Sequence, residues 1–267
     1  VGRDEETGLL RRAWASTQQE ARGQVVSING EAGIGKSVLI DGLKAEARTE
    51  GLQGVTFRCS PYHASSALYP LIAYFKRLAK WQPEDGGGEK LAKLETALEQ
   101  YDQPLAEIVP LIASLLLLPL PADCYPPITI TPQQQKQQTQ DALIAILLER
   151  AEQQPLLSLW EDLHWADPST LELLGLLIDQ APTASLLIIA TARPDGAPDL
   201  GAWAWSSVLA LDALPDVDAE ALATSTAGRS LSTEARALVV DRTDGVATIK
   251  VGEFSQPPLY DSVALDP

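Results

Sequence analysis

Residues 30–37 read GEAGIGKS, which fits the pattern G-x-x-x-x-G-K-[ST] at every fixed position. Glycines let backbone N–H groups curl around a phosphate, and a helix that starts there points its positive end at the same place. In such a loop Lys36 reaches the β- and γ-phosphates and the Ser37 hydroxyl binds Mg²⁺. A chance glycine loop is the alternative, but an apolar run precedes this loop and a helical pattern follows it. We therefore expect a nucleotide to contact Gly30, Glu31, Ala32, Gly33, Ile34, Gly35, Lys36, Ser37 and Val38.

Two acidic residues, Glu161 and Asp162, follow a second apolar run. At the end of a strand, the first acid is expected to hold Mg²⁺ through its water shell and the second to orient the attacking water. Many such ATPases place Asp before Glu, whereas this chain has the reverse order, so Asp162 is expected to act as a weak base. The alternative is an exposed strand end with two solvated acids.

Further polar residues follow the apolar runs. Arg193 ends the run SLLIIATAR, and a strand-end arginine beside a nucleotide can sense the γ-phosphate; a surface ion pair is the alternative. The catalytic candidates are thus Glu161, Asp162 and Arg193. We expect Trp165 to lie in the core and His164 to be structural. Cys59 and Cys124 lack C-x-x-C spacing, so we propose no zinc site.

Short apolar strands that alternate with helical patterns must position these residues. The strands are expected at 24–29, 54–59, 155–162, 185–194 and 208–214. The helices are expected at 4–20, 36–48, 67–81, within a leucine-rich stretch at 90–118, and at 133–152, with a loop at 83–89. Thr131-Pro132 predicts the start of the helix at 133–152, and Asp167-Pro168 the start of another, with Ser169-x-x-Glu172 as a competing capping box.

This alternation predicts an α/β fold, a P-loop NTPase with a five-stranded, mainly parallel sheet covered on both faces. We expect a core over residues 1–212 with a long helical insertion at about 64–152. Residues 213–246 are expected to form an incomplete C-terminal helical lid. Residues 247–267 contain three prolines and no sustained helical period, so we expect an atypical tail.

The composition limits the partners. Twenty basic and 36 acidic residues give a net charge of −16, which disfavours direct binding to nucleic acid or to an anionic membrane. The longest apolar run, 108–122, is too short to span a bilayer and contains three prolines. No signal peptide is visible and there are only two cysteines, so we expect a cytoplasmic protein. The chain opens at Val1 on a motif, so we expect a piece of a longer protein.

Several nucleotide-dependent classes are disfavoured by missing motifs. A GTPase should show N-K-x-D and a transporter ATPase L-S-G-G, and neither is present. A phosphotransferase remains open, because its acceptor pocket has no universal motif. A non-hydrolysing scaffold, in which Glu161 and Asp162 are only structural, also remains open.

Seven segments, which follow one another along the chain in the order given below, resemble the AAA-type ATPase module of the STAND class, the signal-transduction ATPases with numerous domains. The similarity is greatest to bacterial modules that lie between class III nucleotide cyclase domains and helical-repeat tails; related modules occur in multidomain transcription regulators. The segments are VGRDEE at 1–6, GEAGIGKS at 30–37, CSPYHASSALYP at 59–70, YPPITITPQQQK at 125–136, WEDLHWADPSTLELL at 160–174, ATARP at 190–194 and RTDGV at 242–246.

The resemblance implies more than the residues alone. It implies that Val1, Gly2 and Arg3 lie at the adenine and that Arg193 is the strand-end sensor. ATP and Mg²⁺ would be the cofactors of a slowly hydrolysing regulatory switch, so the resemblance implies that the chain is an ATP hydrolase. The partners would be other domains of the full-length protein (cyclase, helical repeat or DNA-binding), with self-association on ATP binding. Ala247 replaces the family's proline, which implies an incomplete lid. The alternatives stay a phosphotransferase with its acceptor site in the helical insertion, and a scaffold.

Overall fold

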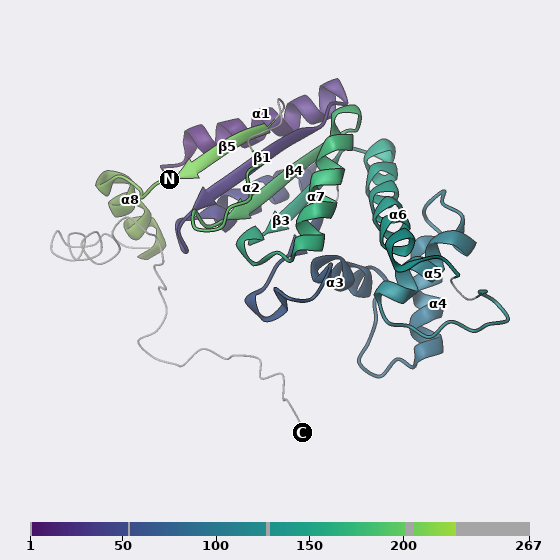
Figure 1. Ribbon diagram of the computed structural model, residues 1–267. Helices are drawn as coiled ribbons and strands as arrows, with labels where there is room; N and C mark the ends of the chain where they lie inside the picture. The colour runs from purple at the N-terminus through teal and green to yellow at the C-terminus, as the bar shows by residue number, and fades with distance from the viewer. Residues whose placement is uncertain (1, 53, 127–128, 201–205, 228–267) are drawn as a thin grey trace.

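A five-stranded sheet forms the centre of the molecule in the computed structural model (Figure 1). The strand order is β2-β3-β4-β1-β5, and every pairing among the strands of this sheet is parallel. The predicted α/β fold with a five-stranded sheet is therefore confirmed. The strands are β1 (Gln24–Gly30), β2 (Gly54–Arg58), β3 (Leu156–Glu161), β4 (Leu186–Ala192) and β5 (Ser206–Leu211). The structure describes residues 2–52, 54–126, 129–200 and 206–227.

Helices cover both faces of this sheet. In a strand successive side chains point to opposite faces, so Leu186, Ile188 and Ala190 join one apolar cluster, while Leu187 and Ile189 join the other. Strands buried on both faces explain the unbroken apolar runs of the sequence. The second cluster lies under α1 (Asp4–Glu20) and α2 (Lys36–Thr49), and the first under α3 (Tyr69–Leu78), α6 (Pro132–Gln153) and α7 (Pro168–Gln180).

A run of helices separates β2 from β3 and lies to one side of the sheet in Figure 1. The leucine-rich stretch at 90–118 holds two helices, α4 (Gly87–Leu98) and α5 (Leu105–Leu115), which are separated before Pro104 because a proline disfavours helical backbone in the residue before it. One expectation is wrong here. The expected loop at 83–89 ends early, because α4 already begins at Gly87. None of the helices that the structure describes has the length and apolarity of a membrane span.

Two helix starts follow the predicted capping chemistry. The Thr131 hydroxyl accepts a hydrogen bond from the Gln134 N–H, and the Gln134 side chain returns to the Thr131 N–H, which starts α6. Asp167 starts α7, because its Oδ1 accepts from the N–H groups of Ser169 and Thr170 at 2.9 and 3.1 Å. The competing capping box is wrong: Glu172 instead forms an ion pair with Lys136 of α6.

The last described helix, α8 (Asp216–Ala227), lies beside the start of the chain (Figure 1). Gly2 has a φ of +72°, and a Cβ there would lie 2.7 Å from the Asp218 Cβ. A glycine is therefore required where the N-terminal segment passes α8. The remainder of the predicted lid, 228–246, and the predicted tail, 247–267, lie outside the described residues. The division into core, lid and tail stays a prediction.

Candidate nucleotide site

The loop between β1 and α2 has the backbone that phosphate binding requires. Gly33 and Gly35 have φ values of +82° and +103°, a region that other residues rarely adopt. A Cβ on Gly30 would lie 2.8 Å from Ile34 Cγ2 and 3.1 Å from the Leu211 carbonyl oxygen. Gly30 and Gly35, the two glycines of the motif, and Gly33 between them are thus required by the fold of the loop, which places its N–H groups at the start of α2.

Lys36 folds back over this loop. Its Nζ donates to the carbonyl oxygens of Gly30 at 2.6 Å and Glu31 at 2.9 Å. Burial lowers the pKa of Lys36, although the negative charge of Asp162 acts in the opposite direction. The ammonium is therefore partly desolvated and bound to neutral carbonyls, so it is available to a stronger, anionic partner.

The strand order brings the two acids to the same edge as the loop. β4 lies between β1 and β3, and all three strands end on this edge. Asp162 follows β3 with a φ of +61°, and its N–H donates to the Thr191 hydroxyl of β4 at 3.0 Å. A cavity of about 320 Å³, which we call the phosphate cavity, is lined by Lys36, Ser37, Ile40, Arg58, Glu161, Asp162 and Thr191.

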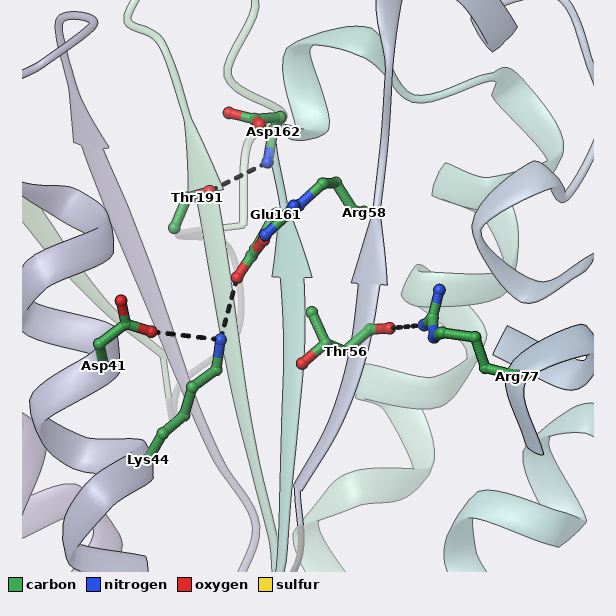
Figure 2. A network of polar contacts seen from close by, with 8 residues as sticks. All are labelled: Asp41, Lys44, Thr56, Arg58, Arg77, Glu161, Asp162 and Thr191. Carbon is green, nitrogen blue, oxygen red and sulfur yellow. Dashed lines mark hydrogen bonds and ion pairs between the residues drawn. The ribbon is translucent and has the colours of Figure 1, made fainter. Parts of the chain in front are cut away.

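Glu161 is the centre of an ion-pair network (Figure 2). Its carboxylate accepts from Arg58 Nε at 2.7 Å and from Lys44 Nζ at 3.2 Å, and its side chain is 13% exposed. Neither cation was predicted from the sequence. Arg58 is the last residue of β2, and only the pairing of β2 with β3 reveals that it lies opposite Glu161.

Arg193 lies just beyond β4 and is exposed. Within residues 2–52, 54–126, 129–200 and 206–227, the structure shows no hydrogen bond or ion pair of its guanidinium. Burial is the largest cause of the lowered pKa of Lys36, and the charge of Asp162 opposes it. The positive charge of Arg193 lowers this pKa further, so the two cations lie within electrostatic range of one another. Arg193 does not line the phosphate cavity, and its sensor role stays a prediction.

His164 and Trp165 lie in a short 3₁₀ turn, Leu163–Trp165, directly after the acids. Trp165 was expected in the core, but it is 36% exposed because the turn directs Leu163 inward instead. Both ring nitrogens of His164 are buried and have no hydrogen-bond partner among the described residues. Burial lowers the pKa of His164, so the ring is neutral and unpaired beside the acids.

A second cavity, also about 320 Å³, lies on the other side of the loop and is mainly apolar. Arg3 lines it and connects three segments: its guanidinium donates to the carbonyl oxygens of Asp212 at 2.6 Å and Ile34 at 3.4 Å, and to Glu6 at 2.8 Å. Gly2 adjoins α8, as described above, whereas Val1 lies outside the described residues. We call this second cavity the base-side cavity. Besides Arg3 it is lined by Thr7, Leu10, Arg11, Ile34, Gly35, Val38, Leu39, Gly42, Leu43, Glu46, Leu214 and Leu222.

The donor set fits a hydrated magnesium ion better than a dedicated metal cage. No cluster of three or more His, Cys, Asp or Glu that could bind a metal occurs in the described part of the chain. Mg²⁺ in phosphate sites keeps several waters and takes one or two protein oxygens, and Ser37 and Glu161, which line the phosphate cavity, carry oxygens of that kind. Cys59 is buried, which raises its pKa to about 12, so it is an unreactive thiol.

The comparisons with known proteins identify the family. A family model described as "AAA ATPase domain" matches residues 1–189, which is well over half of the chain. The chain belongs to this AAA ATPase domain family, and the predicted P-loop ATPase fold is confirmed at that level. Membership implies nucleotide binding.

More distant likenesses were found as well. An uncharacterized protein from Rhizobium meliloti (strain 1021) is 25% identical over 206 residues, which cover 74% of this chain and 19% of that protein. A STAND protein with a tetratricopeptide repeat sensor from Pyrococcus horikoshii has a TM-score of 0.42 and 16% identity, over 92% of this chain and 28% of its own. Cdc6p from Pyrobaculum aerophilum has a TM-score of 0.46 and 12% identity, over 85% and 49%. The chain thus spans about a fifth of the curated relative.

Proposed function

We propose that this chain is an ATP-binding module that hydrolyses ATP slowly and acts as a regulatory switch within a larger multidomain signalling protein. The observation that carries the proposal is the phosphate cavity, which brings Lys36 and Ser37 of the loop together with Glu161, Asp162 and Thr191 from two other strands. Phosphoryl transfer to water needs these groups at one place: cations and N–H groups for the phosphates, oxygens for Mg²⁺, and an acid beside the water.

Each residue has a defined task in this proposal. The N–H groups of residues 30–38 and the Lys36 ammonium bind the phosphates, and Ser37 and Glu161 hold the magnesium ion of the Mg·ATP substrate. Asp162 accepts a hydrogen bond from the attacking water, while Thr191 fixes the Asp162 backbone at 3.0 Å. Arg193 senses the γ-phosphate from the end of β4. Bound Mg²⁺ neutralises charge on the phosphates.

The base-side cavity suits the adenine. Apolar side chains of α2 and α8 and of the segment after β5 supply apolar contact area, and Arg3 lines the cavity as well. Arg3 binds Ile34 of the loop and Asp212 beyond β5 at once, so it links the loop directly to the segment that leads into α8. This link supports a switch in which nucleotide binding biases the arrangement of the lid against the core.

The proposed signalling role rests on two points: the chain covers only a small part of its Rhizobium relative, and its motifs resemble those of STAND modules. The chain spans 19% of its Rhizobium relative, which fits a module of a longer, multidomain protein. The motifs that resemble STAND modules beside class III cyclase domains favour such domains, helical repeats or DNA-binding domains as partners in the cytoplasm, with self-association on ATP binding. The output belongs to those domains, because one fold serves many outputs.

A turnover measurement separates the proposal from its two rivals. Phosphate release from ATP should occur with Mg²⁺ and no added acceptor, and should stop when Mg²⁺ is chelated. Turnover that appears only when an acceptor is added would instead establish a phosphotransferase. Tight ATP binding without any turnover would establish a scaffold.

A further inference from the structure

Arg58 faces the phosphate cavity from the end of the neighbouring strand. It is in register with Glu161 in the parallel pairing of β2 and β3. Side chains of paired residues in adjacent strands point to the same face of a sheet. Arg58 therefore shares the face on which α2 and the loop lie, and it lines the same cavity as Lys36 and Ser37.

The contact that holds Arg58 is a weak one. Its Nη2 lies 2.6 Å from Glu161 Oε2, but the Arg58 side chain is 69% exposed (Figure 2). Ion pairs with an exposed partner contribute little to stability, because water solvates the released charge nearly as well. Arg58 can therefore leave Glu161 without disturbing the sheet.

Glu161 also forms an ion pair with Lys44, and the two cations, Arg58 and Lys44, are not equivalent. Lys44 Nζ lies 3.2 Å from Glu161 and 3.6 Å from Asp41, so it keeps an acidic partner when Glu161 is engaged elsewhere. For Arg58, Glu161 is the single ion-pair partner that the described residues provide. Of the two cations, Arg58 is the one left without an acidic partner among the described residues once Glu161 serves magnesium, so it is free to bind a new anion.

We propose that Arg58 is an additional phosphate-binding residue, which exchanges Glu161 for the terminal phosphate of ATP when Mg·ATP enters the cavity. This inference rests on the proposed function. A guanidinium freed beside a divalent cation is repelled by it and attracted to the phosphate oxygens, which its planar fork matches. ADP lacks the terminal phosphate. Arg58 therefore makes the site prefer ATP to ADP.

The test compares the affinities of ATP and ADP, each with Mg²⁺, for the chain and three variants by calorimetry. Arg58→Ala should lower the preference for ATP over ADP by about tenfold, the value of one charge-assisted contact, and leave ADP affinity unchanged. Arg58→Lys should lose less, because it keeps the charge without the fork. Arg77→Ala is the matched control: Arg77 donates to the Thr56 carbonyl of the same strand at 2.8 Å, and its loss should leave the preference unchanged.

Two results would overturn the inference. An unchanged ATP-to-ADP ratio in Arg58→Ala would mean that Arg58 does not contact the terminal phosphate. Tighter binding of both nucleotides in this variant would mean that Arg58 only competes with magnesium for Glu161. If the unsubstituted chain binds no ATP at all, the proposed function itself fails; if it binds ATP and only the Arg58 result differs, the proposed function stands.

Discussion

Glu161 and Asp162 are adjacent, yet their side chains diverge, and the hydrogen bonds of the two residues go to different groups (Figure 2). Glu161 ends β3 and meets the cations of α2 and β2, whereas Asp162 turns the backbone to a φ of +61° and binds Thr191 through its N–H. The left-handed turn separates the carboxylates, which fits the proposed division of tasks, with Glu161 toward the metal and Asp162 toward the water. Under this proposal the reversed acid order does not exchange the two roles.

The two acids should respond differently to substitution. Glu161→Gln should weaken Mg²⁺-dependent ATP binding by about tenfold, because an amide is a poorer partner for a hydrated cation. Asp162→Asn should leave ATP bound and slow hydrolysis by about 100-fold, because it removes the base. Calorimetry and phosphate release measure the two effects. Asp162→Asn turnover at the parent rate would exclude Asp162 as the residue that orients water.

His164 should lower the stability of the folded chain relative to a variant with an apolar residue at this position. An unpaired buried polar group costs about 1–3 kcal/mol, so His164→Leu should raise the thermal midpoint by about 2 °C or more. Burial lowers the pKa of His164, Asp162 opposes this, and Arg193 and Lys36 add to it. The folded state holds the ring in its neutral form, so protonation opposes folding. The free energy of unfolding is therefore highest above about pH 6.5 and decreases as the pH falls through the lowered pKa.

The leucine variant should accordingly lose less stability than the parent between about pH 7 and about pH 5. Thermal melts at both pH values check this. His63→Leu, which removes the other histidine, should keep the acid sensitivity of the parent. A lower midpoint for His164→Leu at neutral pH would show that the ring is satisfied by a partner such as ordered water.

At the scale of elements, Asp167 connects α7 to the insertion. It is 3% exposed, caps α7 with one oxygen, and with the other accepts from the Leu68 N–H at 3.2 Å. Leu68 precedes α3, so one buried carboxylate fixes the first insertion helix against the segment that carries both acids. The start of α7 and the position of the 161–166 segment therefore depend on each other.

Asp167→Ala should lower the free energy of unfolding by about 2 kcal/mol, since it removes a cap and leaves a buried N–H of Leu68 unpaired. Ser169→Ala is the control, because Ser169 is the start of the competing capping box; it should change stability by about 0.5 kcal/mol or less. Urea denaturation gives both values. Equal losses would show that α7 is not capped by Asp167.

The helices, strands and loop motifs could be predicted from the sequence better than the contacts between elements that are distant in the chain. Strand runs, the phosphate loop and the Thr131 cap depend on neighbouring residues in the chain, so they could be found from spacing alone. Arg58 and Lys44 meet Glu161 only because β2 pairs with β3 and α2 crosses that face, which spacing does not specify. Trp165 was assigned to the core from its type, but the 3₁₀ turn allows only Leu163 to point inward.

At the scale of the whole molecule, a chain of net charge −16 concentrates cations at one edge of its sheet. Lys36 and Arg58 line the phosphate cavity and Lys44 reaches Glu161 beside it. Lys36 and Arg58 offset the charges of Glu161 and Asp162 in the cavity lining, so a small anion avoids the repulsion that the further phosphates of a polyanion would meet at the acidic surface. This distribution fits a nucleotide-controlled module.

Adenine should be preferred over guanine. The base-side cavity is mainly apolar, and the chain lacks the N-K-x-D motif whose acid pairs with guanine. Unlabelled ATP should displace labelled ATP from the chain, while GTP at the same concentration should displace much less. Competition by GTP at equal strength would contradict adenine selection but not phosphate binding.

A calorimetric titration of Mg·ATP into the unsubstituted chain and into Lys36→Ala tests the central claim most directly. Lys36 is the main point charge of the loop, and its Nζ is bound only to the carbonyls of Gly30 and Glu31 within the described residues. The account predicts saturable binding to the unsubstituted chain and no measurable binding to a folded Lys36→Ala, with Lys76→Ala, an exposed lysine of α3, behaving like the parent. ATP affinity in folded Lys36→Ala equal to that of the parent would contradict it.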